Sequence, residues 1–223
     1  MTTPESSQRF DLLVFDWDGT LADSAGHIVA SLQAAFKELG LPVPSVAASR
    51  HVIGLGLKDA LEYLHPGLDP ARYQEVSACY SRHFLNGHEE IELFPDVGAG
   101  IPGLQSDGFL LAVATGKSRR GLERALQLTD LGPHFHASRC ADEGFPKPHP
   151  DMLLALVERL GVQASRTLMI GDTTHDLQMA ANAGVPSVAV TYGAHPVSQL
   201  ERCQPLTMVD SFGDFLKWLK QQA

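Results

Sequence analysis

The fold is decided at residues 12–20, where the chain reads Leu-Leu-Val-Phe-Asp-Trp-Asp-Gly-Thr. A short apolar run that ends in an acid and then a glycine is typical of a buried parallel strand opening into a loop. Asp16 and Asp18 lie two residues apart at the mouth of that strand. Two carboxylates this close repel each other unless a cation or a proton lies between them. The segment therefore predicts a buried strand whose end carries a charged, functional loop.

Further apolar runs in the second half of the chain predict the rest of a sheet. They lie at residues 108–115, 134–138, 167–171 and 186–191, with an edge strand at 206–209. Apolar residues at helical spacing separate these runs, at residues 117–128, 151–160 and 176–183. Strands that alternate with helices indicate an α/β fold, an open parallel sheet with helices on both faces. Ligands bind such sheets beyond the carboxyl ends of the strands.

The pattern changes after the first strand, and only helices are expected there. Ser24 can cap a helix that stops at Gly40. Further helices are expected at residues 46–51, 57–64 and 70–84. We therefore predict an α/β core domain formed by residues 1–22 and 93–223. A small all-helical cap domain, residues 23–92, is inserted directly after the first strand.

Composition excludes some classes of partner and favours a cytoplasmic location. The chain has 223 residues and a formal net charge of −9, which argues against a nucleic-acid surface or an anionic membrane partner. Residues 1–9 are polar, so no signal peptide is expected, and no apolar run is long enough to span a bilayer. The cysteines Cys79, Cys140 and Cys203 are far apart, which favours reduced thiols.

Three later segments bring polar groups to the ends of predicted strands. Residues 115–117 (Thr-Gly-Lys) offer a hydroxyl and backbone N–H groups that can hold phosphate oxygens. Lys147 lies between two prolines that stiffen its loop, and a fixed ammonium can neutralise a phosphoryl group. Residues 171–176 (Gly-Asp-Thr-Thr-His-Asp) add two more carboxylates after a strand.

These groups together suit phosphoryl transfer. Mg²⁺ prefers oxygen ligands in an octahedron and keeps several waters. One carboxylate can attack phosphorus and form an aspartyl-phosphate, and a second, protonated carboxyl can give its proton to the leaving oxygen. Because catalysis of phosphoryl transfer depends mainly on positioning and on charge neutralisation, an acid, a metal, a lysine and a hydroxyl supply what it needs.

In order and spacing, the four segments resemble the four motifs of the haloacid-dehalogenase-like phosphatases, from about residue 12 to residue 193. The helical insert resembles the cap of the phosphoglycolate phosphatase and beta-phosphoglucomutase branch. The resemblance implies a Rossmann-like core and Mg²⁺ as cofactor. By the same resemblance, Asp16 would be the nucleophile and a metal ligand, and Asp18 would be the general acid/base with its backbone carbonyl on the metal. Thr115 and Lys147 would bind the phosphoryl group. Asp172 would be a direct metal ligand, and Asp176 would be a ligand through water or a support for Lys147.

Substrate choice is expected to depend on the loop after the second strand and on the cap. The substrate-binding candidates are Gly116, Lys117, Arg50, Gly56 and Lys58. Residues 54–58 (Gly-Leu-Gly-Leu-Lys) fit a loop that closes on the substrate, and they fit a plain helix–helix connection equally well. His175 touches either the substrate or the solvent.

Other polar residues are expected to be ordinary surface residues. Arg119 and Arg120, near a helix start, are expected to be solvated. His134 and His136 would share one face of the strand predicted at 134–138, as surface histidines rather than as a transition-metal pair.

Three functions fit the sequence. The first is hydrolysis of a small phosphorylated metabolite, with phosphoglycolate as the named substrate. The second is a phosphomutase that uses the same core residues. The third is a non-catalytic regulatory module, which the presence of Asp16, Asp18, Lys147 and Asp172 argues against. The substrate and the oligomeric state, monomer or dimer, stay open.

Overall fold

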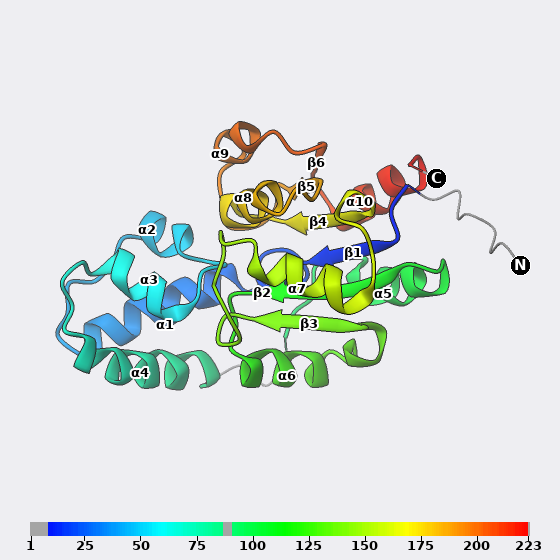
Figure 1. Ribbon diagram of the computed structural model, residues 1–223. Helices are drawn as coiled ribbons and strands as arrows, with labels where there is room; N and C mark the ends of the chain where they lie inside the picture. The colour runs from blue at the N-terminus through cyan, green and yellow to red at the C-terminus, as the bar shows by residue number, and fades with distance from the viewer. Residues whose placement is uncertain (1–8, 87–90, 223) are drawn as a thin grey trace, which may run out of the picture.

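The computed structural model describes residues 9–86 and 91–222, and in them one parallel sheet forms the centre of the molecule (Figure 1). The six strands of this described part run in the order β3-β2-β1-β4-β5-β6. Their bounds are β1 Leu12–Phe15, β2 Leu110–Thr115, β3 Ala137–Cys140, β4 Thr167–Gly171, β5 Ser187–Val190 and β6 Thr207–Val209. Because β1 lies between β2 and β4, the strand order reverses beside it, and its carboxyl end is the topological switch point of the sheet.

Helices cover both faces of the sheet, as the alternation of strands and helices predicted. Alternate residues of a strand point to opposite faces, so Leu13 and Phe15 pack on one side while Leu12 and Val14 pack on the other. The first side is covered by α5 Val97–Ser106, α6 Arg119–Leu128 and α10 Phe212–Lys220. The second side is covered by α7 Asp151–Leu160, α8 Thr174–Asn182 and α9 Val197–Leu200. This is the predicted α/β fold.

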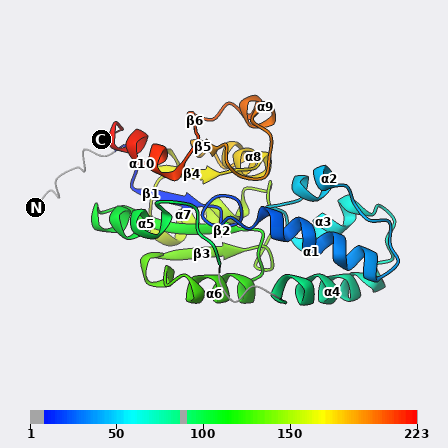
Figure 2. The ribbon, with the colours of Figure 1, turned by 180° about the vertical axis from the view of Figure 1, so that it is seen from behind.

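The segment after β1 is helical. Its helices are α1 Ala25–Glu38, α2 Val46–His51, α3 Leu57–Leu64 and α4 Tyr73–Leu85. They gather beyond the end of the sheet to which the strands point (Figures 1 and 2). They have small apolar clusters of their own, one around Ile28 and Leu32 and one around Phe36 and Leu61. The assignment of residues 23–92 as a separate cap domain stays a prediction.

One predicted strand is misplaced, and one predicted helix is divided. Residues 132–134 form a 3₁₀ turn because Gly132 and Pro133 favour a turn, so the strand expected at 134–138 begins only at Ala137. His134 and His136 therefore share no strand face. The ring Nδ1 of His136 accepts a hydrogen bond from the Leu111 N–H at 3.1 Å. The helix expected at residues 70–84 is a 3₁₀ turn followed by α4.

Cys79, Cys140 and Cys203 are free thiols, as expected. Among the described helices, none combines the length and the hydropathy needed to cross a membrane.

Candidate active site

Three carboxylates meet at the switch point of the sheet. Asp16 follows β1, Asp172 follows β4, and Asp176 lies in the first turn of α8. All three residues are fully buried, and one carboxylate oxygen from each lies within 4.8 Å of the other two. Asp16 Oδ2 has no hydrogen-bond partner among the described residues. A buried cluster of carboxylate oxygens with an unsatisfied member matches the ligand preference of a hard divalent cation.

One buried ammonium lies among these acids. Lys147 Nζ is 2.8 Å from Asp16 Oδ1 and 2.5 Å from Asp176 Oδ1, and its side chain is fully buried. Burial by itself lowers the pKa of Lys147, but the two carboxylates outweigh burial and raise that pKa above its usual value. Lys147 is therefore a permanent positive charge, and the loop between β3 and α7 holds it in place.

The acids carry more negative charge than one lysine can balance. Burial raises the pKa of Asp16, which Lys147 opposes and the neighbouring Asp176 and Asp172 reinforce. Burial and then Asp176 raise the pKa of Asp172 to about 7. When all three buried acids are ionised, their negative charge exceeds the positive charge of Lys147, and a cation between the carboxylates would relieve this excess.

The backbone around Asp172 and Asp176 fixes their orientation. Asp172 accepts hydrogen bonds from the Ala194 N–H at 2.7 Å and from Thr20 Oγ1 at 2.8 Å. Gly19, at φ 82°, comes so close that a Cβ on it would lie 2.1 Å from Asp172 Oδ2. Asp176 Oδ2 accepts a hydrogen bond from the Thr173 N–H at 3.1 Å in a capping box, so Asp176 caps α8 with one oxygen and holds Lys147 with the other.

The second acid of the first motif lies at the mouth of the site. Asp18 Oδ1 accepts a hydrogen bond from Ser24 Oγ at 2.6 Å and lies 2.9 Å from Lys117 Nζ. The Lys117 ammonium also lies 5.0 Å from the centre of the Phe84 ring of α4. Asp18 is therefore held between a lysine of the core and the first turn of the helical insert, outside the buried carboxylate cluster.

Thr115 and Gly116 lie at the end of β2, next to β1. Thr115 is buried, and its Oγ1 accepts a hydrogen bond from the Lys117 N–H at 3.2 Å. Gly116 touches the helical insert, because a Cβ on it would lie 2.5 Å from the Leu55 carbonyl oxygen and 2.6 Å from that of Gly54. The structure therefore brings the predicted cap loop onto the predicted phosphate loop.

The same cap loop reaches the carboxylates. A Cβ on Gly54 would lie 3.8 Å from Asp16 Oδ2. Gly56 and Lys58 line a cleft of about 1780 Å³ between the helical insert and the sheet. The side chain of Lys58 is 74% exposed, and its Nζ lies 3.9 Å from a carboxylate oxygen of Glu62. Residues 54–56 thus form more than a plain helix–helix connection, and substrate binding by Gly56 and Lys58 stays a prediction.

Arg50 and His175 join the helical insert to the sheet. Arg50 donates to the backbone carbonyls of Gly193 at 2.7 Å and Ala194 at 3.1 Å, in the loop that also holds Asp172. His175 Nε2 lies 2.8 Å from the His51 carbonyl oxygen, so this ring contacts the backbone of α2 and is mostly buried. The Arg50 guanidinium thus binds the backbone of residues 193–194, and its predicted role in substrate binding stays a prediction.

His195 is a residue that no sequence pattern singled out. Its Nδ1 accepts from the Thr174 N–H at 3.1 Å, so its Nε2 carries the hydrogen and donates to the His51 carbonyl at 3.0 Å. Burial lowers the pKa of His195 to about 4, which keeps the ring neutral. Its partners are 21 and 144 positions away in the sequence, so local spacing held no signal for it.

Comparison with known proteins decides the family. Residues 13–190 match the family model described as haloacid dehalogenase-like hydrolase. This chain belongs to the haloacid dehalogenase-like hydrolases. The assignment agrees with the parallel sheet, the carboxylate cluster and the four ordered motifs, and it confirms the family that the sequence resembled.

Relatives of this hydrolase include named phosphatases. It is 36% identical over 210 residues to "Probable phosphatase IndB" of Dickeya dadantii, covering 91% of this chain and 90% of the relative. It is 31% identical over 227 residues to "Phosphoglycolate phosphatase" of Escherichia coli K12, covering 92% and 90%. The fold is also similar to a solved structure titled "Putative beta-phosphoglucomutase from Bacteroides vulgatus", with a TM-score of 0.84, 22% identity and coverage of 98% and 91%.

The contact between Gly116 and the cap loop can be tested without any substrate. In Gly116→Ala, a Cβ would lie 2.5 Å from the Leu55 carbonyl oxygen, so residues 54–56 must move away. Amide hydrogen exchange at residues 54–57 should speed up by about tenfold or more, the effect of losing ~1.4 kcal/mol of local stability. Gly98→Ala, where a Cβ meets nothing within 4 Å, is the control. Unchanged exchange in Gly116→Ala would show that the loop does not rest on Gly116.

Proposed function

We propose that this hydrolase is a Mg²⁺-dependent phosphatase that hydrolyses a small phosphate monoester through an aspartyl-phosphate on Asp16. The observation that carries the proposal is the state of Asp16. One of its oxygens is paired with Lys147, while the other is buried beside two more carboxylates and has no hydrogen-bond partner in the described part of the chain. The named phosphatases among the relatives support the same reaction.

The donor set fits the proposed metal. Asp16, Asp172 and the backbone carbonyl of Asp18 would hold Mg²⁺ directly, with Asp176 binding through water or supporting Lys147. A bound Mg²⁺ would neutralise the carboxylates and the phosphoryl oxygens that approach them. The excess negative charge of three buried acids beside one ammonium is the structural support for this assignment.

The chain's own residues perform two successive displacements. Asp16 Oδ attacks phosphorus, the bond between phosphorus and the ester oxygen breaks, and Asp18 gives its proton to the leaving alcohol. Asp18 then takes a proton from a water that attacks the aspartyl-phosphate, which releases inorganic phosphate and restores Asp16. Lys147, the Thr115 hydroxyl and the backbone N–H groups after Thr115 would hold the phosphoryl oxygens throughout.

The helical insert is proposed to choose the substrate. It supplies a wall of the cleft from α1, α4 and residues 52–60, and Asp18 and Lys117 also line this cleft. Phosphoglycolate is the proposed substrate, in keeping with the named relatives. We assign residues 23–92 as the cap domain and the cytoplasm as the location. A phosphomutase is the second candidate, since it would use the same core residues.

Replacing Asp16 tests the nucleophile. Asp16→Asn should lower phosphate release from an aryl phosphate by about 10³-fold or more, because the amide cannot form the acyl phosphate. Asp69→Asn, at an exposed 3₁₀ N-cap that Asn also satisfies, should keep the wild-type rate. Mass spectrometry of the quenched wild-type enzyme should find the phosphoryl group on the peptide containing Asp16. Wild-type turnover by Asp16→Asn would refute the assignment.

Removing the metal tests the cofactor. A chelator should abolish phosphate release, and Mg²⁺ should restore it. Mg²⁺ should also stabilise the protein against unfolding, by about 2.7 kcal/mol at a hundred times its Kd. Asp172→Asn should lose most of that stabilisation, whereas Asp69→Asn should keep it. Full activity in metal-free buffer would contradict the metal requirement.

A panel of phosphorylated metabolites tests the substrate and separates hydrolysis from isomerisation. With Mg²⁺, we expect free phosphate from 2-phosphoglycolate at a higher kcat/KM than from hexose monophosphates. The products of the hexose monophosphates should be checked by NMR. Sugar-phosphate isomerisation without free phosphate would favour the phosphomutase.

A further inference from the structure

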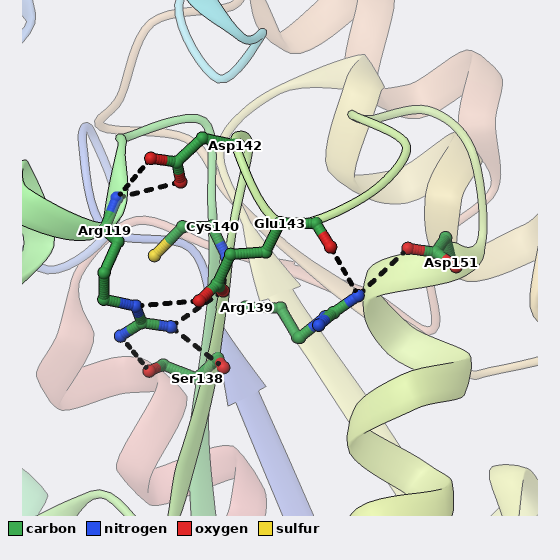
Figure 3. Close-up of polar contacts among 7 residues, drawn as sticks. All are labelled: Arg119, Ser138, Arg139, Cys140, Asp142, Glu143 and Asp151. Carbon is green, nitrogen blue, oxygen red and sulfur yellow. Dashed lines mark hydrogen bonds and ion pairs between the residues drawn. The ribbon is translucent and has the colours of Figure 1, made fainter.

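The loop that carries Lys147 is fastened by a polar network centred on Arg119, a residue expected to be solvated (Figure 3). Arg119 opens α6, two residues after Lys117. Its Nε and Nη2 donate to the two carboxylate oxygens of Glu143 at 2.9 and 2.8 Å. Its Nη1 donates to Ser138 Oγ at 2.8 Å, and its backbone N–H donates to Asp142 Oδ1 at 2.9 Å. The expectation for Arg119 was therefore wrong.

Glu143 is the centre of the turn that this network holds. Its Oε2 also accepts from the Cys140 N–H at 2.9 Å, where β3 ends. The hydrogen bonds from Arg119 lower the pKa of Glu143, so the carboxylate stays charged. The Glu143 carbonyl accepts from Arg139 Nη2 at 3.0 Å. One guanidinium and one carboxylate thus fix the first part of the loop in a bidentate pair.

The far end of the loop has its own anchor. Asp151, at the start of α7, pairs with Arg139 at 3.3 Å and accepts from the Phe145 N–H at 3.3 Å. Between these anchors the chain reaches Lys147, whose ammonium lies 2.8 Å from Asp16. The Lys117 carbonyl accepts from the Ala141 N–H at 3.0 Å, so the loop also rests on residues 115–117.

We propose that Arg119, acting through Glu143, is a positioning residue that fixes the Lys147 loop against residues 115–117. The proposal rests on the proposed phosphatase function for its catalytic consequence. Two of the groups assigned to the phosphoryl oxygens lie in different segments, Thr115 at the end of β2 and Lys147 in the loop after β3, and Arg119 joins these segments. A shift of about 1 Å in such a group costs about 10²-fold in rate, so the join matters for catalysis.

The geometry separates this role from substrate binding. Arg119 does not line the cleft, whereas Arg120 on the same helix does. The donors of Arg119 are directed at Glu143 and Ser138. The Arg119–Glu143 pair is about one third exposed, with side-chain exposures of 32% and 29%, so it contributes little to global stability. Its effect is expected in the placement of the loop rather than in unfolding.

The test uses the chemical protection of Lys147. Its side chain is fully buried, so a small amine-acylating reagent should modify it slowly in the wild type, as measured by mass spectrometry. Arg119→Gln should speed this acylation by about tenfold or more, because the loop opens locally. Glu143→Gln should have the same effect, and the double variant should be no faster than either single variant. Arg159→Gln, an exposed arginine of α7, is the matched control and should behave as the wild type.

Kinetics give the second readout. With the folded state checked by circular dichroism, Arg119→Gln should lower kcat about 10- to 100-fold with a smaller change in KM, and Arg119→Lys should recover part of the loss. Wild-type acylation and wild-type kcat in both Arg119→Gln and Glu143→Gln would overturn the proposal. If the wild type hydrolyses no phosphate ester, the proposed function fails, while the acylation experiment still decides the positioning role.

Discussion

The site is built around a buried ammonium that faces more carboxylates than it can neutralise. Burying a charge is costly unless it is paired, and Lys147 is paired with both Asp16 and Asp176. Asp172 forms no ion pair with any described residue, and its carboxylate accepts hydrogen bonds from Thr20 and a backbone N–H. The carboxylates of Asp16, Asp172 and Asp176 therefore form a cluster that could hold a divalent cation. The strand order, the close approach of Gly19 to Asp172 and the loop that carries Lys147 all keep these groups together.

The sheet topology is the means by which distant residues meet. Strand β1 lies between β2 and β4, so the carboxyl ends of all three strands open at the same edge. Thr115 is the last residue of β2, and Asp16 and Asp172 directly follow β1 and β4. The strand order alone therefore brings these three residues together. The helix-capping role of Asp176 then fixes the last acid, because one of its oxygens is used by the first turn of α8.

The sequence was informative wherever the signal was local. Apolar runs that end in an acid or a threonine identified β1, β2 and β4 together with Asp16, Thr115 and Asp172, because strand burial and strand ends are visible in short windows. The strand expected at residues 134–138 was misplaced, because Gly132 and Pro133 form a turn that the pattern of apolar residues does not indicate. The contacts of Arg119 and His195 could not be predicted from the sequence, because their partners come from other elements of the fold.

The helical insert contacts the site from two sides, and this has a consequence for specificity. Gly54 and Leu55 rest on Gly116, while Arg50 binds the loop of residues 193–195 that holds Asp172. Under the proposed function, a substrate that fills the cleft would have to fit beneath an insert that contacts the core at Gly116 and at the loop beside Asp172. Changes in the insert can alter which alcohol fits without touching the carboxylates. Because residues 54–56 lie close to both Gly116 and Asp16, the proposed function would couple the choice of alcohol to the chemistry through the backbone of this loop.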